Sequence, residues 1–259
     1  MEILQRNIYD FPKYYDLVYG SDWKAEFDFL NGVFAAHSSH PVGNVFEPAC
    51  GTGRLIYRFA RAGFRVGGND LNRSAIEYCN ERLRRAGSTD NAMVGDMTDF
   101  NLQQPVDAAF NTINSFRHLN SETLAANHLG CMADAIRKDG LYVLGLHLSP
   151  ESGETCDSES WSATRGYLTV NSSMWLVERD YESRFERFGM TFDVYTPTRQ
   201  FQIRDEVAFR TYTAIQIQSL IEQNGRFDIE AVYDFHYDLE QPIELNESIE
   251  DVVLVLKRK

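Results

Sequence analysis

The chain has 259 residues, of which 43% are hydrophobic and 24% are charged, and these proportions are typical of a globular protein that buries a core. The formal net charge is −13 and the sequence pI is about 4.9, so a nucleic-acid partner would need a local basic patch. The strongest basic cluster, residues 81–87, is typical of the solvated end of a helix. We therefore expect no nucleic-acid partner.

The four cysteines form no C-x-x-C pair and have no metal-ligand spacing. In a chain of this size they predict free thiols in a reducing compartment. The four are Cys50, Cys79, Cys131 and Cys156. No apolar run approaches the roughly 20 residues that span a bilayer, and the first residues lack the basic and apolar regions of a secretory signal. We expect a cytoplasmic protein without a metal site or a membrane partner.

Residues 44–148 alternate short apolar strands with helical segments, which is typical of a parallel α/β sheet. The expected strands are residues 44–49, 64–70, 91–96, 106–112 and 141–148. The expected helices are residues 53–63, 73–87 and 121–140. The third helix has Ser121 as its predicted N-cap and Gly140 as its predicted stop.

The pattern changes after Pro150. Residues 151–160 are polar and predict a loop, and residues 161–210 alternate apolar with polar side chains, as expected for an antiparallel sheet. A helix at 214–225 and strands at 228–235 and 250–258 then resume the α/β order. The predicted fold is a doubly wound, mostly parallel seven-stranded sheet with a small antiparallel β insertion before the last helix and two strands.

A glycine-containing loop, F-E-P-A-C-G-T-G-R-L at residues 46–55, follows the first expected strand, where doubly wound sheets bind ligands. The dinucleotide fingerprint needs a third glycine three residues after Gly53, and that position is Ile56. The carboxylate of Glu47 would repel phosphates and attract an ammonium group. The loop therefore argues against NAD and for a ligand with a positively charged amino-acid end.

The same loop resembles motif I of the class I S-adenosylmethionine-dependent methyltransferases. Two further acids follow in that family's order: one ends the second expected strand in G-N-D-L-N, and the other ends the third in G-D-M. In the family, the first holds both ribose hydroxyls, the second accepts from the adenine amino group, and their neighbours cover the ring. The resemblance implies S-adenosylmethionine as the cofactor. It predicts these cofactor-binding residues: Glu47, Gly51, Gly53, Asp70, Leu71, Asp96 and Met97.

Residues 110–119, F-N-T-I-N-S-F-R-H-L, resemble the family's fourth motif, and the N-S-F-x-H-L core is similar to that of glycine N-methyltransferase-like enzymes. The resemblance predicts that Asn111 and Ser115 contact the methionine end of the cofactor. His118 occupies the motif's histidine position and is a candidate catalytic or positioning group. Arg117 is a candidate substrate-binding residue. The alternative for this pair is a surface position at the start of the next helix.

Residues 9–23 contain four tyrosines, and a Y-Y-D-x-x-Y segment ahead of motif I resembles the lid of small-molecule methyltransferases. In that family a tyrosine faces the sulfonium, where a cation–π attraction is available. Tyr15 is the predicted cofactor contact, and Tyr19 is the predicted substrate contact. The alternative for these rings is packing on the core.

His147 ends the fifth expected strand and is predicted to face the same crevice. In glycine-methylating relatives an arginine in this region binds the substrate carboxylate, so a histidine puts a glycine-like acceptor in doubt. Histidine titrates near neutrality and can serve as a base for a hydroxyl acceptor. A buried structural histidine is the alternative. Methyl transfer needs a base only when the acceptor must lose a proton.

The resemblance predicts three regions: an N-terminal helical lid at 1–40, a methyltransferase core at 41–150 and 211–259, and an antiparallel insertion at 151–210 that forms a substrate roof or a dimer contact. The predicted function is methyl transfer from S-adenosylmethionine to nitrogen or oxygen of a small molecule, by a monomer or homodimer. The alternatives are a catalytically silent protein that binds S-adenosylmethionine, and an NAD-dependent oxidoreductase.

Overall fold

A computed structural model describes residues 1–89, 91–150 and 157–259. Cys156 and most of the loop expected at 151–160 lie outside the described residues. The three cysteines within them are free thiols. None of the described helices is both long and apolar enough to cross a membrane.

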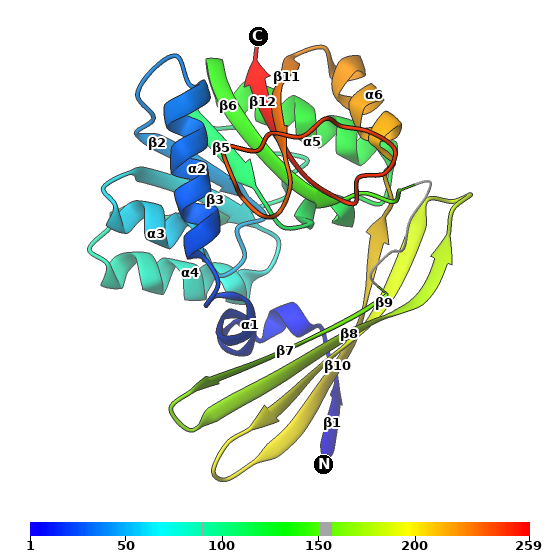
Figure 1. The fold of residues 1–259 in the computed structure, drawn as a ribbon. Coiled ribbons are helices and arrows are strands. Elements are labelled where there is room, and N and C mark those ends of the chain that lie inside the picture. Colours follow the sequence, from blue (N-terminus) through cyan, green and yellow to red (C-terminus); the bar gives the residue numbers. More distant parts are fainter. Residues whose placement is uncertain (90, 151–156) are drawn as a thin grey trace.

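The larger sheet contains seven strands within the described residues, in the order β11-β12-β6-β5-β2-β3-β4 (Figure 1). Only β12 runs antiparallel to its neighbours, β6 and β11. The mostly parallel sheet that the sequence predicts is therefore confirmed. Its strands are β2 (Asn44–Pro48), β3 (Arg65–Asp70), β4 (Ala92–Val94), β5 (Val106–Asn111), β6 (Ile136–His147), β11 (Phe227–Tyr233) and β12 (Asp251–Arg258).

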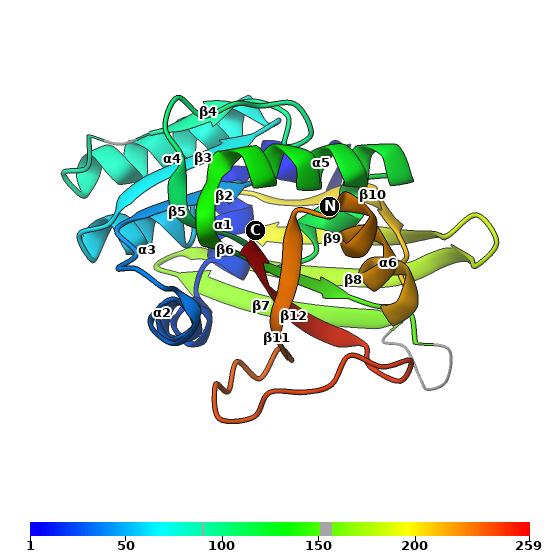
Figure 2. The same ribbon diagram turned by 90° about the horizontal axis from the view of Figure 1, so that it is seen from above.

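Helices cover both faces of this sheet (Figure 2). Alternate residues along the strands point to opposite faces; Leu144 packs in the cluster that includes α5 and α6, and Val143 packs in the cluster that includes α2, α3 and α4. This two-sided burial explains why the central strands are almost entirely apolar. The helices are α2 (Lys24–His37), α3 (Ile56–Arg61), α4 (Arg73–Arg85), α5 (Glu122–Ala135) and α6 (Ala214–Asn224).

The boundary between α5 and β6 differs from the sequence prediction. Ser121 caps the helix by accepting from the backbone N–H of Leu124 at 3.3 Å, as expected. The helix ends at Ala135, however, because Ile136 is buried and joins the sheet. Gly140 lies within β6, where a Cβ atom would stand 2.6 Å from the carbonyl oxygen of Asp107. This glycine therefore permits a close strand approach and does not stop a helix.

The insertion forms a second sheet, in the order β1-β10-β9-β8-β7 within the described residues. Strands β7 to β10 pair antiparallel, which confirms the predicted insertion. The sequence did not indicate β1, which pairs parallel with β10 and brings the N-terminus into this sheet. The strands are β1 (Glu2–Gln5), β7 (Ser158–Arg165), β8 (Leu168–Asp180), β9 (Phe185–Tyr195) and β10 (Gln200–Arg210).

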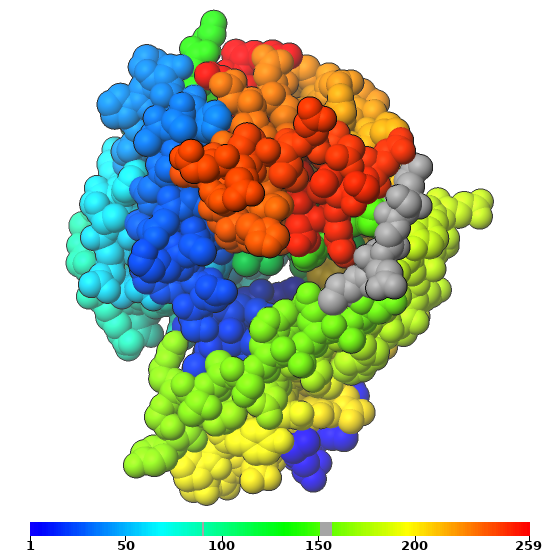
Figure 3. Space-filling view, in the orientation of Figure 1, coloured from blue at the N-terminus to red at the C-terminus, as the bar shows by residue number. Residues whose placement is uncertain are grey.

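Two short helices, η1 (Ile8–Asp10) and α1 (Pro12–Tyr19), lie between the two sheets (Figure 1). Buried apolar residues of α1 pack on the inner face of the smaller sheet, with Leu17 and Phe192 in one cluster. Figure 3 shows a hollow between this sheet and the body of the molecule above it. The carboxyl ends of the parallel strands open toward α1 and η1, which cover them. Because ligands of doubly wound sheets bind at this edge, the hollow is the candidate site.

Candidate functional site

The glycine loop between β2 and α3 adopts the backbone that its sequence requires. Gly51 has φ +51° and Gly53 has φ +69°, in the left-handed region that favours glycine. A Cβ atom at Gly53 would also collide with the sulfur of Cys79 on α4. The loop is therefore held close to α4, and its backbone remains accessible from the strand ends.

Glu47 lies at the start of this loop with only 9% of its surface exposed. Its Oε2 atom is buried and has no hydrogen-bond partner in the described part of the chain. Burial raises the pKa of this carboxyl well above its usual value, although the nearby Arg54 opposes the shift. A buried acceptor without a partner is costly, so this oxygen is prepared to accept from a cationic donor.

Asp70 ends β3 and contacts the glycine loop. Its carboxylate accepts from the backbone N–H of Gly51 at 2.9 Å and from that of Asn72 at 2.8 Å. Burial raises the pKa of Asp70, and these two hydrogen bonds oppose the rise. Leu71 follows with 73% of its surface exposed. Asp70 and the exposed side chain of Leu71 thus lie beside the loop. This position is compatible with the predictions that Asp70 binds the ribose and that Leu71 covers the adenine ring.

Asp96 and Met97 follow β4. Oδ1 of Asp96 accepts from the backbone and the hydroxyl of Thr98, at 2.7 and 2.8 Å, which fixes the carboxylate in a turn. Met97 is 9% exposed and packs mainly in the core around Phe46. Its carbonyl oxygen accepts from Nδ1 of His128 at 2.9 Å. Most of the Met97 side chain is thus occupied by core packing, and its role against the adenine ring stays a prediction.

The fourth motif forms a tight turn after β5. The side-chain amide of Asn111 donates to the carbonyl oxygen of Pro48 at 2.8 Å, while its own buried Oδ1 has no partner among the described residues. Asn114 has φ 53°, and its Oδ1 accepts from the backbone N–H of His147 at 2.8 Å. Ser115 begins the 3-10 helix η2 (Ser115–His118). The turn therefore fixes the ends of β2, β5 and β6 relative to one another.

An ion pair that we did not predict from the sequence supports the glycine loop. Arg54 pairs with the buried carboxylate of Glu26 on α2 at 2.5 Å and donates to the carbonyl oxygen of Asp22 at 3.0 Å. Thr112, after β5, donates its hydroxyl to the same Glu26. In the sequence, the one indication of this ion pair is the arginine that directly follows Gly53.

The tyrosines form a continuous row of ring contacts. Tyr15 lies 5.4 Å from Tyr9 and 4.8 Å from Tyr19 between ring centroids, and Tyr19 lies 5.4 Å from Trp161 of β7. Burial raises the pKa of Tyr15 to about 12, and the charges of Arg54 and Asp70 also act on it. The next residue, Asp16, lies 3.5 Å from the Thr52 hydroxyl, which places Tyr15 near the glycine loop. The Tyr19 hydroxyl is 3.0 Å from the Ser172 hydroxyl on the inner face of the smaller sheet.

His118 faces the row from η2, with Nε2 3.2 Å from the Tyr9 hydroxyl. The residue is exposed, yet the protein packed around its ring lowers the pKa of His118 to about 4, and the charge of Arg117 lowers it further. The ring is therefore neutral at pH 7 and a weak base. Tyr9, which the sequence did not single out, is its partner.

Arg117 points away from the crevice. It is 5% exposed, pairs with the buried carboxylate of Glu186 on β9, and donates from Nε to the carbonyl oxygen of Arg210 at 3.2 Å. Both interactions join η2 to the smaller sheet. This placement corrects the expectation of a substrate ligand at Arg117, because the guanidinium is already bound within the protein.

His147 ends β6 beside the fourth motif, and its ring is only partly exposed. Its Nδ1 is 2.5 Å from Oδ1 of Asp251, the first residue of β12. The ring packs edge-to-face against Phe235, with centroids 5.0 Å apart. The partial exposure of the ring does not fit the alternative of a buried structural histidine.

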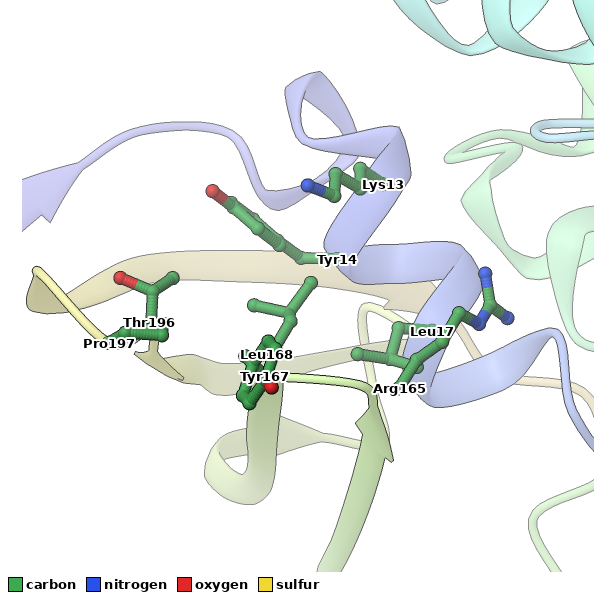
Figure 4. A pocket seen from close by; sticks show the side chains of 8 residues that line it. All are labelled: Lys13, Tyr14, Leu17, Arg165, Tyr167, Leu168, Thr196 and Pro197. Atoms are coloured by element: carbon green, nitrogen blue, oxygen red, sulfur yellow. The ribbon is translucent and has the colours of Figure 1, made fainter.

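A separate hollow of about 270 Å³ lies between α1 and the turns that join β7 to β8 and β9 to β10 (Figure 4). Tyr14 of α1 lies opposite Leu168 and Thr196, and Arg165 lies beside Leu17. None of the predicted cofactor residues lines this hollow. The chemistry described above is instead gathered at the strand ends.

The residues present fit S-adenosylmethionine. The buried Oε2 of Glu47 and Oδ1 of Asn111 both lack partners at the ends of adjacent strands, β2 and β5. An amino-acid end carries an ammonium group, which needs an acceptor such as Oε2 of Glu47. Asp70, the predicted ribose ligand, ends the neighbouring strand β3. The carboxylate of Glu47 would repel the negative charge of a pyrophosphate at this loop.

Comparison with known proteins agrees with this geometry. A family model described as a methyltransferase domain matches residues 45–157. A search of curated proteins gives no match. An S-adenosylmethionine-dependent methyltransferase from Clostridium acetobutylicum has a TM-score of 0.79 at 14% identity, over 97% of this chain and 99% of its own.

Two further solved structures share the fold. KedS8, a sugar N-methyltransferase from Streptoalloteichus, has a TM-score of 0.76 at 16% identity, over 98% of this chain and 94% of its own. CalS10, an amino pentose methyltransferase from Micromonospora echinaspora, was solved with S-adenosylmethionine bound and has a TM-score of 0.73 at 18% identity, over 100% of both chains. Residues 45–157 therefore match the model of a methyltransferase domain, and the chain as a whole shares the fold of these solved methyltransferases.

Proposed function

We propose that this protein transfers a methyl group from S-adenosylmethionine to nitrogen or oxygen of a small-molecule acceptor held between α1 and the strand ends. The observation that carries the proposal is the buried, unpartnered carboxylate oxygen of Glu47 at the glycine loop. This oxygen suits the ammonium group of the cofactor's amino-acid end and opposes the phosphates of NAD.

Bound S-adenosylmethionine supplies a methyl group on a sulfonium, which is already a good leaving group. The protein's own contribution is alignment and exclusion of water. Glu47 would hold the ammonium group, Asp70 the ribose hydroxyls and Asp96 the adenine amino group. The Tyr15 ring, whose pKa senses the charges of Arg54 and Asp70, would stand against the positive charge near the sulfur.

The acceptor class to test first is an amino sugar. Two proteins of the same fold are described as a sugar N-methyltransferase and an amino pentose methyltransferase. Aromatic faces such as those of Tyr9, Tyr19 and Trp161 suit the apolar faces of a sugar ring. The net charge of −13 favours a positively charged amine as the acceptor over a phosphate-rich polymer, which the protein would repel. Hydroxyl acceptors are the second class.

Calorimetry with S-adenosylmethionine, S-adenosylhomocysteine and NAD, each added separately, tests cofactor choice. We expect binding of the first two and none of NAD; binding of NAD alone would favour the oxidoreductase. Transfer of labelled methyl groups to a panel of amino sugars, aromatic amines and their hydroxyl analogues tests the activity. Tight cofactor binding without transfer to any of a broad metabolite pool would favour the silent binding protein.

A further inference from the structure

The connection between β11 and β12, residues 234–250, is unusually long for two neighbouring antiparallel strands. Loops of this length in compact domains commonly carry function. Phe235 and Tyr237 stack within it, with centroids 6.0 Å apart and an interplanar angle of 20°. Phe235 contacts the His147 ring at 5.0 Å, and Tyr237 contacts Phe29 of α2 at 5.3 Å. The connection thus supplies an aromatic wall beside the strand ends.

This wall extends from Phe29 of α2 to His147. The charges of Glu26, Arg54 and Asp251 all act on the pKa of the Tyr237 hydroxyl, which burial raises above its usual value. Strands β2, β5 and β6 run parallel to one another. His147, at the carboxyl end of β6, therefore lies at the same edge of the sheet as the predicted cofactor residues Glu47 and Asn111.

The pair has the geometry of a base with its orienting group. A carboxylate only accepts hydrogen bonds, so Nδ1 of His147 carries the proton that is shared with Asp251 at 2.5 Å. Nε2 is then the unprotonated nitrogen, and it makes no hydrogen bond within the described residues. The backbone N–H of His147 donates to Asn114 at 2.8 Å, and the ring is 32% exposed. The ring is thus held in position and remains accessible.

We propose that His147, oriented by Asp251, is the base that takes the proton of the methyl acceptor. The acceptor nitrogen, as an ammonium, loses one proton to Nε2 and becomes a free amine. Its lone pair then forms the bond to the methyl carbon while the carbon–sulfur bond breaks and leaves its electron pair on sulfur. The proton passes from the imidazolium to water. A hydroxyl acceptor would lose its proton to the same atom. This inference rests on the proposed function.

The charged and titratable groups around the ring belong to two elements. Asp251 comes from β12, and Asp234, His236 and Tyr237 come from the connection; the charge of Asp251 also acts on His236. His236 and Asp234 form a second histidine–carboxylate pair at 2.9 Å, with the His236 side chain 88% exposed. This exposed pair is a matched control, because it has the same side-chain chemistry but lies within the connection and not at the end of β6.

The tautomer of His147 can be read by NMR of protein labelled with ¹⁵N in the histidine rings, without any acceptor. We expect the His147 signals of a ring with the proton on Nδ1, assigned by their loss in His147→Gln. In Asp251→Asn the ring should lose this preference, whereas His236→Gln should leave it unchanged. A proton on Nε2 in the unmodified protein, or no change in Asp251→Asn, would overturn the proposal.

Kinetics with an acceptor found in the panel above provide the second measurement. His147→Gln should lower kcat at least tenfold with little change in KM for S-adenosylmethionine, and imidazole should partly restore the rate of His147→Gly. Asp251→Asn should give a smaller loss, and His236→Gln should keep the full rate. Unchanged kcat in His147→Gln would exclude the role. If no acceptor is methylated at all, the proposed function fails, while the NMR result still decides whether the pair is built as inferred.

Discussion

A single buried carboxylate shows how binding chemistry and stability oppose each other at the residue scale. Glu47 is desolvated and lacks a partner at Oε2, so its charge is unfavourable until a cation arrives. An uncharged side chain at this buried position would favour the stability of the unliganded protein. An acid at this position is thus the expected result if Glu47 binds the ammonium group of the proposed cofactor.

The first prediction replaces this acid. Glu47→Gln should weaken binding of S-adenosylmethionine by about 1.5–3 kcal/mol, through loss of a charge-assisted hydrogen bond. The unliganded variant should melt at the same or a higher temperature, because the buried charge is removed. Calorimetry and thermal unfolding check both parts, with the exposed Glu222→Gln on α6 as the control. Unchanged affinity would make Glu47 a structural residue.

Individual site residues could be predicted only where a local motif carried them. Glu47 and Asp70 follow from strand ends and glycine spacing. The sequence could not supply the partners, because they come from distant segments: Tyr9 is 109 residues from His118, and Asp251 is 104 residues from His147. For Arg117 the motif predicted a substrate contact. It could not reveal that the guanidinium already pairs with Glu186 on β9.

At the scale of elements, one buried acid attaches α1 to the methyltransferase core. Asp16 is 3% exposed, accepts from Arg82 of α4 at 2.5 Å and from the Tyr78 hydroxyl at 3.0 Å, and lies 3.5 Å from the Thr52 hydroxyl in the glycine loop. The helix that would cover the cofactor is therefore connected both to α4 and to the loop. These contacts of Asp16 would hold the predicted lid at residues 1–40 against the core. The lid itself stays a prediction.

Asp16→Asn tests this link. The change leaves the charge of Arg82 poorly compensated and should destabilise the protein by about 3 kcal/mol, since both partners are largely buried. Amide hydrogen exchange in residues 8–20 should accelerate, and affinity for S-adenosylmethionine should fall. Asp28→Asn breaks an exposed pair with Lys24 and should change stability by less than about 1 kcal/mol. Equal effects of the two substitutions would contradict a special role for Asp16.

A further prediction concerns the start of β6. Gly140→Ala should destabilise the protein by about 1–3 kcal/mol, because the added methyl would stand 2.6 Å from the Asp107 carbonyl oxygen. Gly130→Ala on α5 has open space around the new Cβ and should be neutral or stabilising by up to about 1 kcal/mol. Denaturant unfolding compares them. Equal stability of both variants would mean that β6 can shift to accommodate the added methyl group without loss of stability.

Element types were predictable along most of the chain, since hydrophobic periodicity separates buried strands from amphipathic helices. The end of α5 was not. Residues 136–140 include a glycine that reads as a helix stop, yet Ile136 gains more by joining the sheet next to Val106. The strand β1 was also missed, because four residues with little apolar pattern become a strand only when β10 provides an edge.

At the scale of the whole molecule, buried ionic contacts join the two sheets. Glu186 of β9 binds Arg117 of the core and also accepts from Arg179 of β8 at 2.6 Å. Removing one partner of such a group leaves a buried charge. The smaller sheet is therefore attached to the site by specific polar contacts as well as by apolar packing.

Acid should weaken the whole fold through a buried histidine. His128 is 0% exposed and burial lowers its pKa to about 4, so the folded protein keeps the ring neutral while the unfolded chain takes up a proton near pH 6.5. Stability from this group is complete above pH 6.5 and is lost as the pH falls toward 4, by roughly 3 kcal/mol in total.

Denaturant unfolding between pH 7 and pH 4.5 checks this dependence. His128→Gln should be less stable at pH 7, because hydrogen bonds to Met97 and Tyr142 are disturbed. Its stability should nevertheless change less with pH than that of the unmodified protein over this interval. Parallel curves for the two proteins would show that another group governs the acid response.

The pairing of β1 with β10 has a consequence for synthesis on the ribosome. The backbone of Ile8, at the entry to α1, donates to Asp205, which is made 197 residues later. A nascent chain that stops before β10 can hold the glycine loop but has no partner strand to anchor the segment that covers it. Residues 2–8 are thus translated long before the strand that anchors them, and the proposed cofactor site is enclosed only when the insertion has been translated.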